Sequence, residues 1–546
     1  MITFATVIFS IFFTVLSIQT SIRKMKFVYM GLALITCLLY PIITEFFIGL
    51  EGLRLAVIYY LNPGGKRSWQ DRTKATFIHY LPYLVLLTGF VYWRLFIFSS
   101  VRPTTDMDML TNLYKSNPLS MIVSIMAGYV RDLLNSIIMA WFIPTSIYFL
   151  TTRPIVDTVL FLLLGILISV LVWFYLRWMR KYDNNDGLRK DENDHLLKVN
   201  IWIGFFVVLC ALLPIELTNR GIDLSYGQTT DRYTIVTTLG VIPLVLGLIF
   251  LLSRRKSRNT LVIGILFLSI LGQYGNISFF RDGWDDQKQI WWQLAWRAPQ
   301  LKDGTVLMLN PPENTRYFFG EDYVTWGPAD MIYNNKPHSQ IIYSQVLTTN
   351  TANELKRGLR GERFIRNIYF VFDYKNTLLI SMPGSSNTCL HVIDSFRPEL
   401  SLNEPALVQL AAPYSNIQQI NTDAPDNLPP EIIFGPEPEH TWCYYYQKMS
   451  LSRQLGNWMQ VVILGKEAME AGFQPQDLSE WMPLIEAYTY SGDLNEAMKL
   501  LDKVRVDSAL SYNLCLSVLN QKNNMDLNLT ETGFIFLSHN LCSTGQ

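Results

Sequence analysis

The hydrophobic pattern of the chain changes near residue 280. Before that point, apolar runs are long enough to cross the roughly 30 Å of bilayer hydrocarbon, which takes about 20 residues in a helix. After it, short strand-like runs alternate with helical patterns. The pattern predicts membrane spans near 1–19, 27–44, 46–62, 78–98, 133–150, 155–176, 197–215, 233–253 and 259–279.

The first apolar run has the length of a secretory signal peptide, but its basic residues follow the run, whereas those of a signal peptide precede it. Arg23, Lys24 and Lys26 follow the run, and no basic residue precedes it. A retained span is therefore favoured over a cleaved signal.

Basic segments predict which side each span faces, because positive charge prefers the cytoplasmic side of a membrane. They lie at 23–26, 64–74, 177–190 and 254–258. Residues 27–62 lie between two of them, so we expect a helical hairpin that turns near Glu45 on the other face. The last span then places residues 280–546 on the exoplasmic side of the cytoplasmic (inner) membrane. The stretch 119–151 must cross an even number of times but is too short for two spans, so we expect an interfacial or re-entrant helix there.

Four tryptophans follow the last span, in the stretch RDGWDDQKQIWWQLAWRAP. They are Trp284, Trp291, Trp292 and Trp296. Tryptophan concentrates at membrane–water interfaces, because its ring is apolar while its N–H needs a partner. We expect a juxtamembrane helix that packs the soluble half onto the bilayer. The alternative is an aromatic platform on which a sugar ring stacks. Nucleic-acid binding is disfavoured, because no basic groove surrounds the stretch.

The remaining sequence predicts two further domains, after a polytopic helical membrane domain over 1–280 with about 8–10 spans. Residues 281–440 favour a small exoplasmic α/β domain. Its predicted elements are strands at 304–310 and 389–396, two strands joined by a turn at 374–376, and a helix at 351–361 with Thr351 as N-cap and Glu354 three residues on. The proline-rich segment 423–442 is a linker or an ordered wrap.

Residues 441–546 have a helical pattern that matches part of a tetratricopeptide repeat. The matching positions are Trp481, Leu484, Tyr488, Gly492, Ala497 and Leu501. The helix at 455–472 would belong to a preceding repeat, and a generic helical hairpin is the alternative. Because three or more repeats are usually needed for a stable core, this segment should lean on the α/β domain or bind a protein partner.

Composition and charge narrow the function further. Charged residues make up 16% of the chain and the net charge is zero, so no basic field recruits nucleic acid. The six cysteines make no metal-binding CxxC pair, and Cys389 and Cys443 could pair in an oxidising compartment. No hydrolase, zinc-protease or P-loop motif occurs.

Candidate site residues therefore lie among the charges near the outer membrane face. Glu45, Glu51 and Arg54 sit inside an apolar hairpin, where charges mark either a site or an internal pair. Arg94 lies near the outer end of its span, where it either holds a phosphate or extends to the interface.

Two further candidates lie in outer loops. Asp106 and Asp108 have a D-x-D spacing that can hold a divalent cation beside a diphosphate, with a solvated loop as the alternative. Arg232 and Tyr233 open a late span, where an Arg–Tyr pair suits a lipid-phosphate headgroup or anchors the helix at the interface.

The order of these parts resembles the GT-C superfamily of polyprenyl-phosphate-sugar-dependent glycosyltransferases. Within that superfamily it is similar to the O-mannosyltransferases that carry tetratricopeptide repeats, and to bacterial membrane proteins with the same layout. The resemblance covers 1–280 by layout and 455–505 by repeat, with DRYTIVTTLG at 231–240 as a short match. It implies a donor sugar linked to a polyprenyl phosphate. One departure matters: members of the superfamily carry a catalytic acid in a first outer loop, whereas the run 1–19 leads into a basic turn.

We therefore expect an N-terminal portion of the fold to be missing, and no catalytic base is carried over. The leading hypothesis is a GT-C-like membrane protein whose Arg94, Arg232 and Tyr233 bind a lipid-linked sugar at the outer face. Glu45 is the candidate base for an inverting transfer. The alternative is a non-catalytic scaffold that binds a protein partner through its exoplasmic domains.

Overall fold

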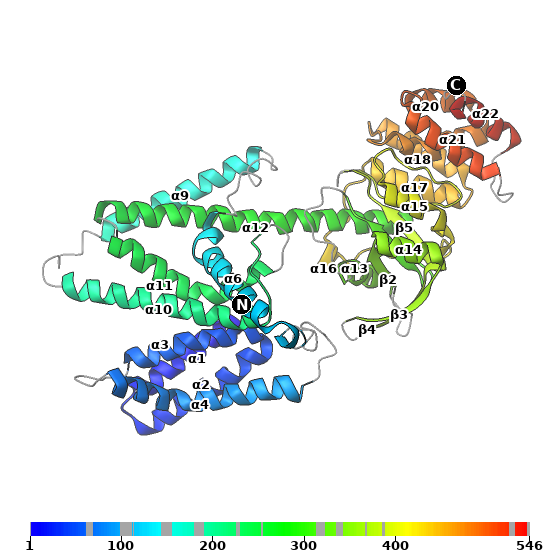
Figure 1. Ribbon diagram of the computed structural model, residues 1–546. Coiled ribbons are helices and arrows are strands. Elements are labelled where there is room, and N and C mark those ends of the chain that lie inside the picture. The colour runs from blue at the N-terminus through cyan, green and yellow to red at the C-terminus, as the bar shows by residue number, and fades with distance from the viewer. Residues whose placement is uncertain are drawn as a thin grey trace. The chain divides into compact units, whose positions relative to one another are not determined.

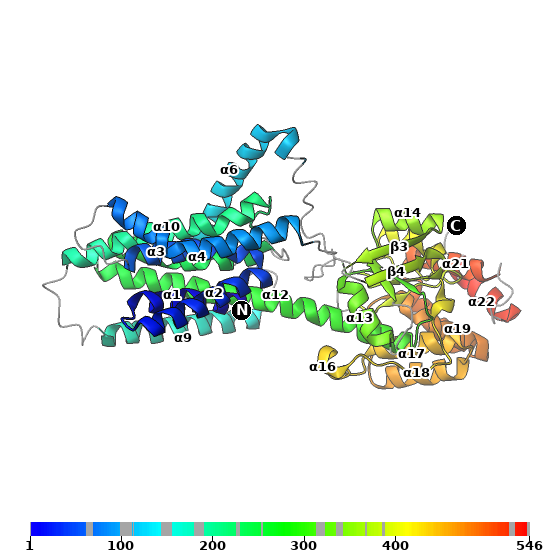
Figure 2. The same ribbon diagram turned by 90° about the horizontal axis from the view of Figure 1, so that it is seen from below.

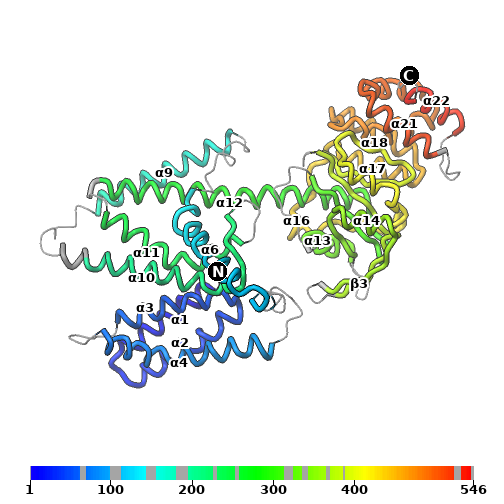
Figure 3. Tube along the Cα trace, in the orientation of Figure 1, coloured from blue at the N-terminus to red at the C-terminus, as the bar shows by residue number. Residues whose placement is uncertain are grey.

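The computed structural model divides the chain into two compact units, Met1–Ser278 and Phe279–Gln546, called here the first and second unit (Figure 1). The division falls inside one continuous helix, α12 (Arg255–Arg297). The residues described are 2–61, 69–98, 112, 114–142, 155–179, 190–224, 230–252, 255–312, 323–334, 342–365, 368–384, 388–522 and 530–542 (Figure 3).

The first unit is helical, and α1, α2, α3, α4 and α10 run side by side (Figure 2). Its elements are α1 (Ile2–Gln19), α2 (Arg23–Ile43), the 3₁₀ helix η1 (Glu45–Leu50), α3 (Glu51–Leu61), α4 (Trp69–Phe96), α6 (Pro118–Leu134), the π-helical η2 (Asn135–Met139), α7 (Ala140–Phe142), α9 (Ile155–Met179), α10 (Lys190–Leu217), η4 (Thr230–Tyr233), α11 (Thr234–Leu252) and the first part of α12. Small residues let helices approach closely: a Cβ on Gly204 of α10 would lie 2.6 Å from the Gly240 carbonyl of α11.

Eight helical stretches in the described part of the chain are long and apolar enough to cross a membrane. They are Ile2–Gln19, Arg23–Ile43, Trp69–Phe96, Pro118–Phe142, Ile155–Met179, His195–Leu217, Thr230–Leu252 and Ser257–Arg297. The chain is therefore compatible with a multi-pass membrane protein. The predicted span 46–62 is not among them, because it is broken into η1 and α3.

The broken segment nevertheless forms the second arm of the predicted hairpin. Glu45 at its start pairs with Arg94 in the last turn of α4. Near its end, the Tyr59 ring lies under the guanidinium of Arg72, which belongs to the first turns of α4. The guanidinium carbon is 5.0 Å from the ring centroid. Six 3₁₀ and 11 α-helical residues together extend about 28 Å. The Tyr40 hydroxyl of α2 donates to Glu51 of this arm at 2.6 Å, so the predicted turn near Glu45 is present, and the membrane face on which it lies stays a prediction.

The stretch predicted to be interfacial or re-entrant overlaps Pro118–Phe142, which is long and apolar enough to cross a membrane, contrary to that prediction. The chain around α6 packs against one end of α10. The Tyr114 hydroxyl donates to the Leu217 carbonyl at 3.1 Å, and the Tyr129 hydroxyl donates to the Leu209 carbonyl. A Cβ on Gly128 would collide with the Glu216 carboxylate. All three partners lie in the last third of α10, so α6 crosses the end of that helix. The part of this prediction at 143–151 lies outside the described residues.

The second unit contains a small sheet with helices around it. Its elements up to residue 434 are β1 (Val306–Asn310), α13 (Tyr323–Tyr333), β2 (Tyr343–Val346), α14 (Thr349–Arg357), β3 (Arg360–Ile365), β4 (Ile368–Asp373), η5 (Tyr374–Asn376), β5 (Thr377–Ser381), β6 (His391–Val392), α15 (Ala406–Ala411), η6 (Ala412–Tyr414), η7 (Ile417–Gln419) and α16 (Glu431–Phe434). The main sheet has the order β2-β1-β5-β6, in which β1 is parallel to β2 and β5, and β6 is antiparallel at the edge.

Both faces of the main sheet are covered, which is why β1 and β5 are apolar runs without alternation. Leu307 and Leu309 face one buried cluster, and Val306 and Met308 face another. The strands predicted at 304–310 and around 374–376 are present. The two strands beside that turn belong to different sheets, because β4 pairs with β3 and β5 with β1.

Two local predictions need correction. The N-cap of α14 is Thr348, and Thr351 is the third helical residue, whose side chain completes a reciprocal capping box. The helix starts earlier and ends at Gly358, which has a φ of 60°. Of the strand predicted at 389–396, only His391–Val392 pairs with the sheet. The proline-rich segment 423–442 is an ordered wrap, in which Phe434 is buried.

The tryptophan-rich stretch does not anchor the protein at a bilayer surface. Trp291, Trp292 and Trp296 are at most 4% exposed and belong to the core on one face of the sheet. Trp284 is half-buried and stacks on Phe434, with 5.8 Å between ring centroids. The prediction of interface anchoring is wrong because the helix turns this apolar side toward protein.

The C-terminal part of the second unit is helical. Its elements are α17 (Trp442–Gln454), α18 (Trp458–Glu470), η8 (Leu478–Trp481), α19 (Met482–Ser491), α20 (Leu494–Val504), α21 (Ser508–Lys522) and α22 (Glu531–Cys542). Trp481, Leu484, Tyr488, Ala497 and Leu501 are buried in one core, and Gly492 makes the turn with a φ of 80°. The membership of these hairpins in the tetratricopeptide family stays a prediction.

Candidate functional site

The sequence-predicted residues meet at the end of the first unit where η1 begins. Glu45 opens η1, and Arg94 in the last turn of α4 donates from its Nε to the Glu45 carboxylate. The pair is partly open, with side-chain exposures of 49% for Glu45 and 25% for Arg94. The guanidinium of Arg94 also lies over the Phe98 ring at 5.1 Å.

Phe46, the next residue of η1, connects this ion pair to the second predicted pair. Its ring packs edge-on against Tyr233 at 4.7 Å between centroids. Tyr233 is buried, and Arg220 donates from Nη1 to its hydroxyl at 3.1 Å. Arg232 stands over the same ring at 5.5 Å. All four predicted residues therefore lie around the start of η1.

Arg232 differs from the other cations of this cluster. Its side chain is exposed, and no carboxylate within the described ranges forms an ion pair with it. Glu45 holds Arg94, and the Tyr233 hydroxyl accepts from Arg220. The guanidinium of Arg232 thus remains available to an anionic ligand, and arginine binds phosphate through two parallel hydrogen bonds.

A buried aspartate fixes the loop beside this cluster. Asp132, fully buried in α6, accepts from the Ile222 backbone N–H at 2.7 Å and from Arg131 Nε at 2.8 Å. Asn135 donates to the Ile222 carbonyl at 3.0 Å. Asp132 is a functional candidate that was not predicted, although a carboxylate inside an apolar run is itself a signal of a role.

Sequence analysis also missed Arg220 and Glu216. Arg220 lies in the polar loop after α10, where nothing in its spacing links it to Tyr233. Glu216 is 4% exposed near the end of α10, and its Oε1 has no hydrogen-bond partner. The candidate cation ligands Asp106 and Asp108 lie outside the described residues. Within the part that is described, no group of three or more metal-ligating side chains occurs.

The charges deeper in the hairpin form an internal pair. Arg54 donates to both oxygens of Glu51, at 3.1 and 2.9 Å from Nε. Its Nη2 donates to Ser10 Oγ at 2.8 Å, and the Tyr40 hydroxyl donates to Glu51 at 2.6 Å. Arg54 is fully buried and Glu51 is 5% exposed. With every charge satisfied inside the bundle, the structural interpretation holds for this pair.

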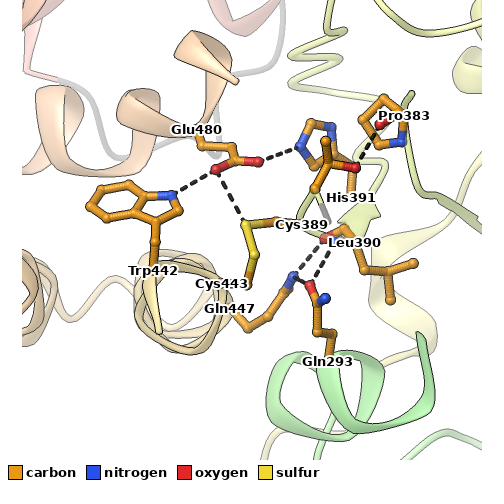
Figure 4. Close-up of a disulfide and its surroundings, with 10 residues drawn as sticks. Gln293, Pro383, Cys389, Leu390, His391, Trp442, Cys443, Gln447 and Glu480 are labelled. Atoms are coloured by element: carbon orange, nitrogen blue, oxygen red, sulfur yellow. Dashed lines mark hydrogen bonds and ion pairs between the residues drawn. A yellow bond between two sulfur atoms is a disulfide. The ribbon is translucent and has the colours of Figure 1, made fainter. Parts of the chain in front are cut away.

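A second polar cluster lies in the second unit beside the Cys389–Cys443 disulfide (Figure 4). His391 stands between two carboxylates, with Nδ1 3.4 Å from Glu404 Oε1 and Nε2 3.4 Å from Glu480 Oε1. Trp442 donates to Glu480 at 2.6 Å. Burial by itself lowers the pKa of His391, but the interactions with Tyr446, Glu404 and Glu480 outweigh it and raise the pKa well above its ordinary value.

Two arginines extend this cluster. Arg453 binds both oxygens of Glu399, at 2.6 and 3.0 Å. Arg397 donates to Glu486 at 3.5 Å. Burial lowers the pKa of Arg453, but the neighbouring Glu399 and Glu486 carboxylates raise it further than burial lowers it. These groups hold the C-terminal helices against the sheet segment and leave no carboxylate open to solvent chemistry.

Comparison of the chain with protein-family models, with curated protein sequences and with solved structures found no match.

Proposed function

We propose that this chain is a GT-C-like membrane protein that binds a polyprenyl-phosphate-linked sugar at the start of η1. The observation that carries the proposal is the exposed Arg232, stacked on a buried Tyr233 and left without an ion-pair partner among the described residues. Arg94 and Arg220 lie in the same cluster. A phosphate diester held there would gain charge-assisted hydrogen bonds at the depth of a lipid headgroup.

We infer that this end of the first unit faces the exoplasmic side of the cytoplasmic membrane. The basic residues Arg23, Arg72, Arg177 and Arg258 lie at the opposite ends of their helices, and positive charge favours the cytoplasm. The second unit supports the same orientation, since Cys389–Cys443 and Cys515–Cys542 form disulfides. Disulfides persist in oxidising compartments.

If the bound sugar is transferred, an inverting reaction needs a carboxylate that accepts the proton of the acceptor hydroxyl. Glu45 is the candidate, because it is partly exposed beside the arginines. Arg94 donates to one oxygen of its carboxylate, so a donor phosphate that drew Arg94 away would free both oxygens to accept a proton. Phosphate binding and activation of the base would then be coupled.

The test is binding of farnesyl phosphate to the detergent-purified full-length protein, measured by native mass spectrometry or microscale thermophoresis. Arg232→Gln should weaken binding by about tenfold, the effect of losing one charge-assisted hydrogen bond at a partly solvated site. Lys198→Gln, an exposed change on α10, should leave binding unchanged, and farnesol should bind both proteins weakly. Equal farnesyl phosphate affinity for wild type and Arg232→Gln would contradict the assignment.

A non-catalytic scaffold is the second candidate, favoured by exposed apolar side chains on α18, on α21 and in the turn between α20 and α21. Met459, Val506 and Tyr512 are 72%, 84% and 61% exposed, which suits a protein partner. Two results together would favour this function. The protein would bind farnesyl phosphate normally without transferring anything to an acceptor, and a protein partner bound by the wild type would be lost in Val506→Asp.

A further inference from the structure

Arg297 is a buried cation that forms no ion pair with any carboxylate of the described residues, although Asp394 interacts with it at longer range. It is the last residue of α12 and is 3% exposed. Its Nη1 has no hydrogen-bond partner, and within the described ranges no carboxylate lies at ion-pair distance from it. An unpaired charge is rarely kept inside a protein, because its desolvation is not compensated.

The guanidinium lines a small cavity inside the second unit. Its other lining residues include Arg397, Arg453, His391, Asp394 and Glu399. The cavity volume is about 20 Å³, which is enough for one particle near the size of a water molecule. Phosphate, sulfate and organic anions are too large for it.

The cations around this cavity are not equally compensated. Arg453 has Glu399, Arg397 has Glu486, and His391 lies between two glutamates. Asp394 is the remaining carboxylate of the lining, and it accepts the Phe396 backbone N–H at 2.9 Å. The Nε of Arg397 is a second buried donor without an acceptor. Two arginines that each have an unfilled donor therefore line one water-sized space.

We propose that this cavity binds a single small monovalent anion, and that chloride is its ligand. Chloride supplies the negative charge that Arg297 lacks and accepts the unused N–H groups of Arg297 and Arg397. It would join three separate parts of the second unit: the end of α12, the segment after β6 and helix α17. A neutral water could accept the same hydrogen bonds but would leave the charge of Arg297 uncompensated.

The experiment measures thermal unfolding of the detergent-purified full-length protein by intrinsic fluorescence. Sodium chloride replaces sodium gluconate at constant ionic strength, since gluconate is too large for the cavity. We expect the midpoint to rise by a few degrees and to saturate as chloride increases. Arg297→Gln should abolish the rise, whereas Arg357→Gln, an exposed change on α14, should retain it.

A midpoint that does not depend on chloride would overturn the proposal and assign the cavity to water. A rise that persists in Arg297→Gln would place the anion elsewhere. If Arg297→Gln does not fold, wild-type crystals grown in bromide decide the question. An anomalous peak beside Arg297 is expected, and a bromide-soaked crystal without that peak would refute the site.

Discussion

The two units bury charge in different ways. In the first unit, Glu51 and Arg54 lie one helical turn apart, and nearby hydroxyl groups complete their hydrogen bonds. In the second unit, the partners come from distant segments: Arg397 and Glu486 are 89 residues apart, and His391 and Glu480 are also 89 apart. The ion pair of Glu51 and Arg54 can form within its own helix, although its other hydrogen bonds come from Ser10 and Tyr40 on other helices. The ion pairs of the second unit form only after distant segments have met.

The Glu51–Arg54 pair has all its hydrogen bonds filled, whereas the charged cluster of the second unit has an unfilled donor on Arg297. The Glu51–Arg54 pair has one cation for one carboxylate, and every donor of the pair is used within the bundle. The second unit collects charges from α12, the sheet edge and the C-terminal helices, and Arg297 is left over. The network of the second unit therefore has an unfilled donor beside a small cavity, whereas the Glu51–Arg54 pair has none.

The largest expected effect comes from breaking the local pair. Arg54→Met leaves the Glu51 carboxylate buried without its counter-charge, and should lower the free energy of unfolding by about 3–5 kcal/mol. The measurement is an SDS or guanidinium titration of the full-length protein in detergent micelles. Adding Glu51→Gln to Arg54→Met should recover much of the loss, because no buried charge remains. A double variant as unstable as the sum of the single variants would show that the pair is not a closed unit.

The same contrast explains what could be predicted of the fold. Long apolar runs predicted seven of the eight helices that are long and apolar enough to span, since hydropathy is a local property, whereas Pro118–Phe142 was expected to be interfacial or re-entrant. The hairpin at 27–62 followed from basic segments on both sides. Its broken second arm was not predictable, because a 3₁₀ segment inside the bundle depends on packing against α10, where Gly49 touches the Cys210 backbone. Burial of Trp291 and Trp292 was missed for the same reason: composition alone does not distinguish a lipid surface from a protein core.

The candidate site shows a similar limit. Arg232 and Tyr233 were predicted because they are adjacent in sequence and open an apolar run. Their neighbour Phe46, from a segment nearly two hundred residues earlier, became visible only in the structure. Arg297 was not predicted either, since a basic residue at the end of a helix is common and favourable, and only the structure shows that its Nη1 has no acceptor among the described residues.

A disulfide variant sharpens the comparison by acting on one unit. Replacing Cys389 and Cys443 by serine removes a link between residues 54 apart, and should destabilise the second unit by about 2–4 kcal/mol. The measurement is the thermal midpoint with and without reductant. Reductant should lower the wild-type midpoint, and by less in the variant, which keeps only Cys515–Cys542. In the first unit Cys37 and Cys210 are free, so Cys210→Ser should respond to reductant like wild type. A wild-type protein insensitive to reductant would contradict both the pairing and the exoplasmic placement.

The smallest expected effect is a pH dependence that belongs to the network of the second unit. The pKa of His391 is raised above its ordinary value of about 6.5, so its protonation stabilises the folded state fully below that pH and the contribution is lost as pH rises through the higher folded value. The slope is at most about 1.4 kcal/mol per pH unit, since one proton is involved. Burial also raises the pKa of Glu480, and His391 opposes that rise, so the prediction concerns only the pH range above 6.5. His391→Gln should flatten the curve of unfolding free energy against pH in that range. An unchanged curve above pH 6.5 would mean that Glu404 and Glu480 do not hold His391 in its charged form. His391 and these two glutamates would then be hydrogen-bonded neutral groups.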